Sequence, residues 1–384
     1  MSGLRVGIDG EALRRPLSGV GHYVFQLCRE LEALWPDAQF FAYARLPAER
    51  LALPSERWQL RQEPLPALRR IPSFAWLRTR GRQLAQADRL DVFWAGRTLH
   101  PRLPAPVRTV CTVHDLNHLL VPETMELPTR WSHRLWFAGD LERADAVLAN
   151  SQGTAQRLRQ RLGVAVDAVV TPGLAPHFRP PSEPESQTAA VRLAAVGIAP
   201  PYLLSVATLE PRKNVAGLLR AFVALKRAGE LPAHRLVLVG ARGWRQTTLE
   251  RELAAACEFG VVIAGYVPDE MMPALYAGAD ALVCPSFYEG YGMPVLEARA
   301  CGARVLVADV PELREAGGPH AIAVPPTLDG LRDGLKRVLA TPRVAEADLA
   351  RRHAWRAGAL RLAAVLQGRP EAGPARPEAA RSHP

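Results

Sequence analysis

Short apolar runs alternate with helical stretches along the whole chain, and this alternation limits the fold more than any other feature. In the first half the runs that predict strands lie at residues 6–8, 40–43, 92–94, 107–113, 146–149 and 168–171. Helices are expected at 20–34, 129–143 and 152–162, the last of them capped by Asn150-Ser151. Strands that alternate with helices in this way predict a parallel sheet.

The same pattern restarts in the second half of the chain. Apolar runs at residues 202–206, 236–239, 261–263, 281–284 and 305–307 predict further strands. Uninterrupted apolar runs are typical of parallel strands that are covered on both faces. A chain of 384 residues also fits two domains. We therefore predict an α/β protein with two Rossmann-like, doubly wound domains and a ligand in the cleft between them, at the carboxyl ends of the strands.

The composition of three segments indicates where these domains end. Residues 176–201 are rich in proline, serine and glutamate, which is typical of a linker, and the residues after Gln367 have the composition of a disordered tail. The expected division is an N-terminal domain at 1–180, a linker at 181–200, a C-terminal domain at 201–345, a last helix at 346–367 and a tail at 368–384.

Two glutamates follow one predicted strand, in the segment Cys284-Pro285-Ser286-Phe287-Tyr288-Glu289-Gly290-Tyr291-Gly292-Met293-Pro294-Val295-Leu296-Glu297. The glycines let the backbone approach a ligand, and the start of a helix at Gly292-Met293 attracts an anion. A phosphate would repel a carboxylate, so Glu289 and Glu297 are expected to accept hydrogen bonds from hydroxyl groups. A nucleotide sugar offers hexose hydroxyls to one and ribose hydroxyls to the other. The alternative is a helix-capping acid and a surface acid.

Two adjacent cations follow another predicted strand, in the segment Ser205-Val206-Ala207-Thr208-Leu209-Glu210-Pro211-Arg212-Lys213-Asn214. Arg212 and Lys213 near a helix start suit a diphosphate, both in binding it and in stabilising the charge that grows as it leaves. A solvated basic loop is the alternative interpretation.

Taken in order, these motifs resemble those of the family-4 retaining glycosyltransferases of the GT-B fold, a group that includes bacterial mannosyl- and rhamnosyltransferases of polysaccharide assembly. The resemblance covers residues 6–324, and the E-x7-E pair of Glu289 and Glu297 is its most specific part. Further typical motifs are Glu-Pro-Arg-Lys-Asn at 210–214, Val239-Gly240-Ala241-Arg242-Gly243-Trp244, and Gly265-Tyr266-Val267 followed by Leu275-Tyr276. The chain departs from the usual pattern at Ala207, where the family has glycine, and at Arg299 and Arg304, where Met and Pro are common.

The resemblance implies roles for the matching residues of the second domain. Arg212 and Lys213 would hold the donor diphosphate, and Glu289 would contact hydroxyls of the donor sugar. Glu297 would bind the ribose, and Val267 would lie along the base. Backbone N–H groups near the sugar would come from Gly290, Tyr291, Gly292 and Met293.

In the first domain, which the resemblance makes the acceptor-binding one, His114-Asp115 matches a position where the histidine approaches the sugar and the reacting centre. Gly19 and Gly21 match a glycine-rich loop near the phosphates and the acceptor. A structural histidine and a plain turn are the alternatives. With Val24 the two glycines resemble an incomplete dinucleotide fingerprint, but the third glycine is absent, so an NAD site is poorly supported.

The expected mechanism uses neither a metal nor another cofactor. The sequence near the site contains no Asp-x-Asp motif and no His/Cys cluster with metal-ligand spacing, and no carboxylate pair is typical of a hydrolase. The diphosphate would instead be stabilised by Arg212, Lys213 and helix dipoles. The resemblance implies front-face attack with retention of the α-configuration, closure of the domains, and a last helix that crosses back to the first domain.

The resemblance favours GDP-mannose or a GDP-6-deoxyhexose such as GDP-rhamnose as the donor, while a UDP- or dTDP-sugar stays open. The expected acceptor is a saccharide, linked to a lipid, in lipopolysaccharide O-chain assembly. Two rival functions remain. A catalytically silent nucleotide-sugar-binding subunit is disfavoured by the intact cations and glutamates, and a nicotinamide oxidoreductase is disfavoured by the incomplete glycine fingerprint.

Positive charge is concentrated in one part of the chain. The net charge is +10, and residues 66–108 hold nine arginines against two aspartates, interleaved with aromatic and aliphatic residues. Residues 130–137 mix cations and aromatics in the same way. Such segments can lie on anionic membranes, whereas an arginine-rich surface with buried tryptophans is the alternative. The charge is not accompanied by a nucleic-acid-binding motif, so nucleic acid is not an expected partner.

The expected location is the cytoplasm, peripheral to the cytoplasmic face of the inner membrane. Residues 4–9 have the pattern of a strand rather than of a secretory signal, and no run approaches the ~20 apolar residues that span a bilayer. The five cysteines are scattered and are interpreted as core residues without a disulfide framework.

Overall fold

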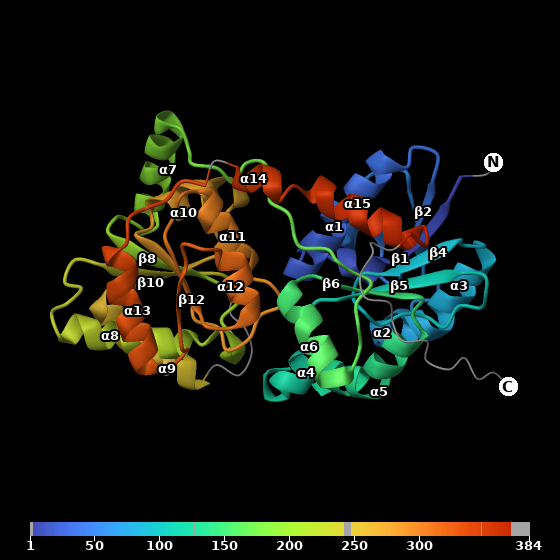
Figure 1. Ribbon diagram of the computed structural model, residues 1–384, viewed down its shortest axis with the longest axis horizontal. Helices are drawn as coiled ribbons and strands as arrows, with labels where there is room; N and C mark the ends of the chain where they lie inside the picture. The colour runs from blue at the N-terminus through green and yellow to red at the C-terminus, as the bar shows by residue number, and fades with distance from the viewer. Residues whose placement is uncertain (1–2, 126, 242–246, 347, 370–384) are drawn as a thin grey trace. The chain divides into compact units, whose positions relative to one another are not determined.

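The computed structural model describes residues 3–125, 127–241, 247–346 and 348–369, and it divides into two compact units (Figure 1). The first unit consists of Met1–Gly173 with Ala354–Pro384, and the second of Leu174–His353. Each unit contains its own parallel sheet with helices on its faces.

The first unit has a seven-stranded parallel sheet in the order β3-β2-β1-β4-β5-β6-β7. Its strands are β1 (Arg5–Asp9), β2 (Gln39–Ala44), β3 (Trp58–Gln62), β4 (Val92–Ala95), β5 (Arg108–Val113), β6 (Ala146–Ala149) and β7 (Ala168–Val169). Its α-helices are α1 (Gly19–Leu34), α2 (Ser73–Trp76), α3 (Arg82–Ala87), α4 (Asn117–Leu120), α5 (Leu127–Arg143), α6 (Gln152–Leu162) and α15 (Trp355–Leu366).

The second unit has a six-stranded parallel sheet in the order β10-β9-β8-β11-β12-β13. Its strands are β8 (Tyr202–Val206), β9 (Arg235–Val239), β10 (Val261–Gly265), β11 (Ala281–Cys284), β12 (Val305–Ala308) and β13 (Ile322–Val324). Its α-helices are α7 (Glu183–Ala195), α8 (Val215–Arg227), α9 (Thr247–Ala256), α10 (Met272–Gly278), α11 (Met293–Ala300), α12 (Pro311–Gly317), α13 (Leu328–Ala340) and α14 (Leu349–Arg352).

Both sheets have the strand order of a doubly wound fold, so the prediction of two Rossmann-like domains is confirmed. In such a sheet a ligand binds outside the carboxyl ends of the strands, where the strand order reverses. This point lies between β1 and β4 in the first unit and between β8 and β11 in the second.

Every predicted apolar run overlaps a strand, and most of these strands are buried on both faces: all four residues of β6 and of β12 are buried, whereas Ile263 of β10 is exposed. Two strands were not predicted, β3 and β13, and each lies at an edge of its sheet. β3 has the sequence Trp-Gln-Leu-Arg-Gln, and only its tryptophan is buried. β3 therefore lacks the apolar run that marks the central strands, whereas β13 is apolar but only three residues long.

A helix occupies most of the segment that was expected to be a linker, so this expectation is corrected. Helix α7 begins after Ser182, whose backbone N–H donates to the Glu185 carboxylate as part of a capping box. Pro184 in the first turn also suits a helix start. The composition indicated a linker, but the spacing of Ser182 and Glu185 was the signal for a helix.

The last predicted helix, 346–367, is interrupted, which is a second correction. Helix α14 ends at Arg352 and α15 begins at Trp355. The backbone N–H of Leu174 donates to the carbonyl of His353 at 2.7 Å. This carbonyl therefore accepts a hydrogen bond from another segment of the chain and not from a continuing helix. Residues 370–384 of the expected tail, and Arg242, Gly243 and Trp244 of the motif at 239–244, lie outside the described residues.

Helix α15 belongs to the core of the first unit. It packs along α1, as Figure 1 also shows, and its buried residues include Ala359, Leu362 and Val365. The ring of Trp355 lies 6.0 Å from that of Tyr23, edge to face. The hydrophobic core of the N-terminal sheet is therefore completed by residues from the other end of the chain.

Candidate active site

The loop after β8 presents the two predicted cations of the second unit. A single 3-10 turn, Pro211–Lys213, carries Arg212 and Lys213, and Asn214 follows in the left-handed conformation (φ 52°) before α8 begins. The Asn214 side-chain amide donates to the carbonyls of Pro285 and Pro326. This loop is therefore fixed against the loops that follow β11 and β13.

The loop after β11 carries Glu289 and leads into α11. Gly292, the residue before the helix, has a φ of 107°, a conformation that L side chains rarely adopt. A Cβ there would also lie 2.7 Å from the side chain of Leu313. The Phe287 N–H donates to the carbonyl of Arg212 at 2.9 Å, so the two loops are joined through their backbones.

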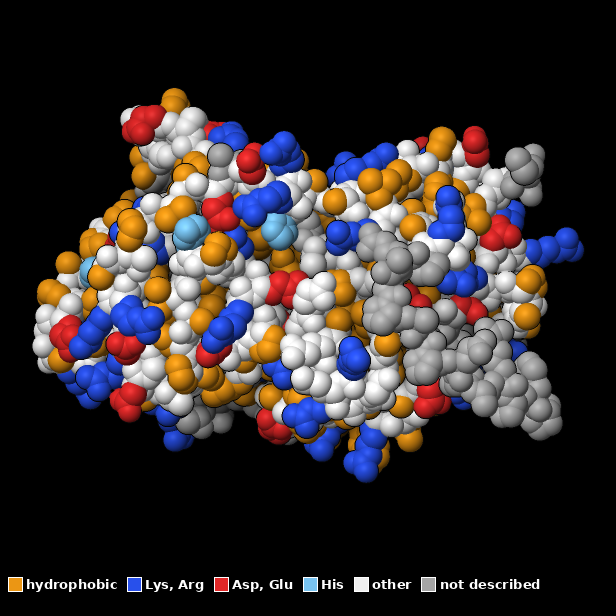
Figure 2. All heavy atoms as spheres, viewed as in Figure 1, with side chains coloured by type: hydrophobic (Ala, Val, Ile, Leu, Met, Phe, Trp, Pro, Cys, Tyr) orange, Lys and Arg blue, Asp and Glu red, His pale blue; other side chains and the backbone are white. Residues whose placement is uncertain are grey.

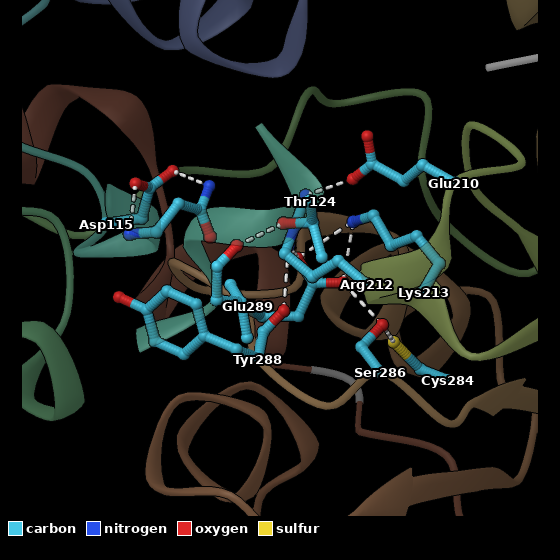
Figure 3. A network of polar contacts seen from close by, with 11 residues as sticks. Asp115, Thr124, Glu210, Arg212, Lys213, Cys284, Ser286, Tyr288 and Glu289 are labelled. Carbon is cyan, nitrogen blue, oxygen red and sulfur yellow. Dashed lines mark hydrogen bonds and ion pairs between the residues drawn. The ribbon is translucent and has the colours of Figure 1, made fainter. Parts of the chain in front are cut away.

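Arg212 and Lys213 both contact Glu289, as Figure 3 shows. The Lys213 ammonium lies 2.6 Å and 2.8 Å from the two carboxylate oxygens, and the Arg212 guanidinium donates to Oε2 at 2.9 Å. Ser286 donates to Oε1 at 2.7 Å. Arg212 also donates to the carboxylate of Glu210 at 2.6 Å. The structure thus brings three of the predicted residues into one ionic cluster.

The cluster keeps Glu289 ionised. Burial of this carboxyl group disfavours its charged form, but the charges of Lys213 and Arg212 outweigh burial and lower its pKa to about 2. A carboxylate held in this way accepts hydrogen bonds and does not act as an acid near neutral pH. The two cations, which remain partly exposed, carry the positive charge that an anionic ligand would meet.

Glu297 lies on α11 itself and makes a separate contact. Its Oε2 accepts a hydrogen bond from the Tyr276 hydroxyl of α10 at 2.8 Å. Burial raises the pKa of Glu297 to about 7, with a contribution from Asp269, while the hydrogen bond from Tyr276 opposes the rise. The two glutamates of the E-x7-E pair therefore have opposite pKa shifts, because cations contact Glu289 and a neutral hydroxyl contacts Glu297.

The other predicted donor-binding residues of this unit line the start of α11 or the core beside it. Gly290 and Met293 are partly buried, and Gly292 is the N-cap of α11. Tyr291 and Val267 are buried, and both pack in the core cluster that also contains Tyr276. Their side chains therefore lie in the hydrophobic core of the second unit.

In the first unit, His114 follows β5 and is buried. Its Nε2 lies 2.7 Å from the carbonyl of Gly96, and its ring packs edge to face on Tyr23 at 4.9 Å. Burial lowers the pKa of His114, although the carbonyl contact and the charge of Asp115 oppose this shift. A neutral ring that donates from Nε2 offers Nδ1 as a hydrogen-bond acceptor. Asp115 accepts hydrogen bonds from the backbone and side-chain amides of Asn117.

Gly19 and Gly21 lie in the first turn of α1, where the Ser18 side chain accepts a hydrogen bond from the N–H of Gly21. A Cβ on Gly21 would lie 2.8 Å from the carbonyl of Ala12, so this position has no room for a side chain. A Cβ on Gly19 would contact no described atom within 4 Å.

A cavity of about 350 Å³ opens within the first unit at the carboxyl ends of its strands. Ser18, His114 and Asp115 line it, as do Phe74 and the ion pair of Asp9 with Arg97, whose side chains approach to 2.6 Å. The cavity thus combines an apolar wall with several polar groups, which is the usual lining of a small-molecule site.

Sequence reasoning assigned no role to several residues that contact the predicted ones or line this cavity, among them Glu210, Tyr276, Ser286 and Arg97. Glu210 and Ser286 lie only two and three residues from their partners Arg212 and Glu289, so each of these contacts is local. Tyr276 contacts Glu297 from another helix, and the sequence carried no local signal for that contact. Asp9 is an acidic residue at the end of the first predicted strand, and this position could have indicated the Asp9–Arg97 pair in the sequence.

Two family models match this chain, one in each half. The model of glycosyltransferase family 4 matches residues 17–173, and that of glycosyl transferases group 1 matches residues 196–358. These matches contain all of the predicted site residues.

Relatives and solved structures extend the similarity to most of the chain. The O-antigen chain mannosyltransferase B of Escherichia coli is 30% identical over 363 residues, which cover 87% of this chain and 92% of that protein. A GDP-mannose-dependent alpha-(1-6)-phosphatidylinositol monomannoside mannosyltransferase of Mycolicibacterium smegmatis is 30% identical over 194 residues, which cover 45% of this chain and 49% of that protein. The fold matches the crystal structure of Anabaena Alr3699/HepE in complex with UDP-glucose, with a TM-score of 0.71, 18% identity, and coverage of 95% of this chain and 100% of that chain. Since the first relative matches over nearly its whole length and both halves match their family models, this chain belongs to the family-4 glycosyltransferases and is an enzyme of glycosyl transfer with the GT-B fold.

Proposed function

We propose that this enzyme transfers mannose, or a 6-deoxyhexose such as rhamnose, from a GDP-sugar to a lipid-linked saccharide, with retention of the α-configuration. The product would extend a cell-surface polysaccharide such as the lipopolysaccharide O-chain. The ionic cluster of Arg212, Lys213 and Glu289 at the carboxyl ends of β8 and β11 carries this proposal.

The two cations would bind the donor diphosphate. An ammonium has three N–H donors, so Lys213 can hold Glu289 and contact a phosphate oxygen together. During transfer the bond between the anomeric carbon and the diphosphate breaks, and the acceptor oxygen takes its place on the same face. The leaving phosphate oxygen takes the acceptor proton. Arg212 and Lys213 would stabilise the charge that develops on this leaving group, with the N-terminus of α11 beside them.

The remaining predicted residues would orient the donor. Glu289, ionised by its two cations, would accept hydrogen bonds from hydroxyls of the sugar, and Glu297 would accept hydrogen bonds from the ribose. Val267 and the N–H groups from Gly290 to Met293 would complete the nucleotide site. In the first unit His114, neutral through its burial, would serve as a hydrogen-bond acceptor near the sugar, with Asp115, Gly19 and Gly21 close to it.

The names of the relatives support the donor and the product. The Escherichia coli relative is named for O-antigen chains, and the Mycolicibacterium relative for its dependence on GDP-mannose. A UDP-sugar is the second candidate, since the HepE structure contains UDP-glucose. Because the cations recognise the diphosphate and Glu297 the ribose, the described contacts suit either base.

We also propose that the enzyme works in the cytoplasm on an anionic membrane surface, through helix α5. Leu127, Trp131 and Leu135 on this helix are 60%, 56% and 63% exposed. Their spacing of four residues places them on one face of the helix. Arg134 lies against Trp131 on this helix. By contrast Trp76, in the arginine-rich segment, is fully buried, which fits the alternative of a tryptophan in the core for that residue.

Two further observations bear on how the enzyme would contact a membrane. Among the described residues no helix has the length and apolar character needed to cross a membrane. Basic and acidic side chains are interspersed over the face that Figure 2 shows. Peripheral contact through exposed apolar side chains and nearby cations fits both observations.

Thermal-shift measurements with GDP-, UDP- and dTDP-sugars would test the proposed donor. Selective stabilisation by GDP-mannose or another GDP-sugar is expected, and it should be lost in Lys213→Ala but kept in Lys336→Ala, an exposed lysine paired with Glu230. Selective stabilisation by a UDP- or dTDP-sugar would replace the proposed donor, and no stabilisation by any of them would count against the site itself.

Vesicles that contain phosphatidylglycerol would test the membrane proposal, with neutral phosphatidylcholine vesicles as the control. Equal binding to both would contradict it.

A further inference from the structure

Tyr276 and Glu297 form a hydrogen bond that has no part in the proposed transfer step. Tyr276 is fully buried in α10, and its ring packs 6.1 Å from that of Phe178. Its hydroxyl donates to Oε2 of Glu297 at 2.8 Å. Because packing holds the ring in place, the hydroxyl fixes one oxygen of a carboxylate that is itself only partly buried.

We propose that Tyr276 is a positioning residue for donor binding, which orients the Glu297 carboxylate toward the ribose and favours its ionised form. This inference rests on the proposed function, because it takes Glu297 as the ribose-binding group. The hydrogen bond occupies one lone pair of Oε2, so Oε1 and the rest of Oε2 are available to ribose hydroxyls. A donor to the charged form of a carboxylate also favours that form.

The surroundings of Glu297 make its charge sensitive to pH near neutrality. Burial raises the pKa of Glu297 to about 7, Asp269 adds a negative charge nearby, and the Tyr276 hydrogen bond opposes both. The thiols of Cys301 and Cys284 lie in the same surroundings, and Arg179 influences Cys301.

Cys284, Cys301 and Tyr276 stay uncharged over the range in which Glu297 titrates. Burial raises the pKa of Cys284 to about 11 and that of Cys301 to about 12, and it raises the pKa of Tyr276 well above its usual value. Both thiols and the phenol therefore stay protonated between about pH 5.5 and 9. Of these groups, Glu297 is the one whose protonation changes near pH 7.

The sign of the effect follows from the protonation of Glu297. Above its pKa the carboxylate accepts charge-assisted hydrogen bonds from the ribose, and below it the neutral acid forms weaker ones. Nucleotide affinity should therefore be full at alkaline pH and fall as the pH drops through about 7. Removal of the Tyr276 hydroxyl withdraws a donor from the charged form, which raises the pKa of Glu297 and moves this fall to higher pH.

Isothermal titration of GDP-mannose into the full-length protein between about pH 5.5 and 9 tests the inference, because its diphosphate is esterified at both ends and, unlike the terminal phosphate of GDP, loses no proton in this range. The wild-type Kd should rise about tenfold toward the acid end, the difference between a charge-assisted and a neutral hydrogen bond. In Tyr276→Phe the midpoint of this rise should move up by roughly one pH unit. The Kd at the alkaline end should also rise, because the carboxylate is no longer oriented by the hydroxyl. A purely structural role would weaken binding equally at every pH.

Tyr202→Phe is a matched control. Tyr202 is also buried, and its hydroxyl donates at 2.7 Å to the carbonyl of Leu275, the residue before Tyr276. Its loss removes a buried hydrogen bond to the same helix without touching Glu297. This variant should keep the wild-type midpoint.

An unchanged midpoint in Tyr276→Phe would overturn the role of Tyr276. If that variant does not fold, Glu297→Gln is the second test, because an amide does not titrate. The Glu297→Gln protein should bind the nucleotide weakly and with a Kd that does not depend on pH. A remaining transition near pH 7 would overturn the inference. The ribose is common to GDP- and UDP-sugars, so UDP-glucose replaces GDP-mannose if the wild type prefers it. Wild-type protein that binds neither nucleotide at any pH would instead refute the proposed function, and with it this inference.

Discussion

The Lys213 ammonium contacts both carboxylate oxygens of Glu289, at 2.6 Å and 2.8 Å, although the two residues are 76 positions apart in the chain. The contact forms because β8 and β11 are neighbours in the sheet. The loops after these strands therefore meet at one edge. This pairing ties the cations proposed for the diphosphate to the carboxylate proposed for the sugar, and it gives the first prediction.

Lys213→Ala should lower the rate of transfer by about 100-fold or more, since it removes a cation from the leaving diphosphate. The fold should remain, because Arg212 and Ser286 still donate to Glu289. Initial rates with a labelled donor would measure the loss. Lys336→Ala serves as the control, and wild-type activity in Lys213→Ala would remove this lysine from the mechanism.

Glu289→Gln should reduce stability in a pH-dependent way. The pKa of Glu289 in the folded protein, about 2, is below its value in the unfolded chain, so its contribution is present above about pH 4.5 and is lost as the pH falls through 2. At pH 7 the variant leaves two cations without their carboxylate, which we expect to cost about 2–3 kcal/mol. Urea unfolding at pH 7 and pH 3 would show this difference shrink. A difference that stays constant or grows toward acid would contradict the assignment.

Removal of the ribose 2′-hydroxyl should weaken nucleotide binding. If Glu297 accepts hydrogen bonds from the ribose, 2′-deoxy-GDP leaves part of this carboxylate unsatisfied and should bind about tenfold more weakly than GDP. Competition titrations would give the ratio of the two affinities. Glu297→Ala should bind both nucleotides equally, whereas a ratio that survives in this variant would place ribose recognition elsewhere.

Replacing the exposed apolar side chains of α5 should weaken membrane binding. Trp131→Ser with Leu135→Ser removes two side chains that are 56% and 63% exposed, so stability should change little. Partitioning onto phosphatidylglycerol vesicles should fall about tenfold or more, because each side chain would bury apolar area in the interface. Leu360→Ser, at a 52% exposed leucine of α15, is the control. An equal loss of vesicle binding in both variants would mean that α5 is not the helix through which the enzyme binds the membrane.

Two leucines of α15 should differ in their effect on stability. Leu362 is fully buried in the core of the first unit, whereas Leu360, two residues earlier, is half exposed. Leu362→Ala should lower the free energy of unfolding by about 2–4 kcal/mol, and Leu360→Ala by less than about 0.5 kcal/mol. Calorimetry of both variants would compare them. Similar small effects would indicate that α15 contributes little to this core.

The apolar runs of the chain were enough to predict two doubly wound parallel sheets. A central strand such as β6 is buried on both faces, so its sequence is apolar throughout and visible without any partner. The edge strand β3 and helix α7 were missed for different reasons. β3 is too exposed to show an apolar run. The segment around α7 has the composition of a linker, although its capping residues indicate a helix.

The candidate site divides in the same way. Residue type and local periodicity are properties of short segments, so they were enough to place Arg212 and Lys213 after one strand and Glu289 after another. The folded chain was needed to show that these three side chains meet, that Tyr276 contacts Glu297, and that α15 completes the core of the first unit. Each of these contacts depends on strand order and helix packing between distant segments, and no pattern within a single segment contains that information.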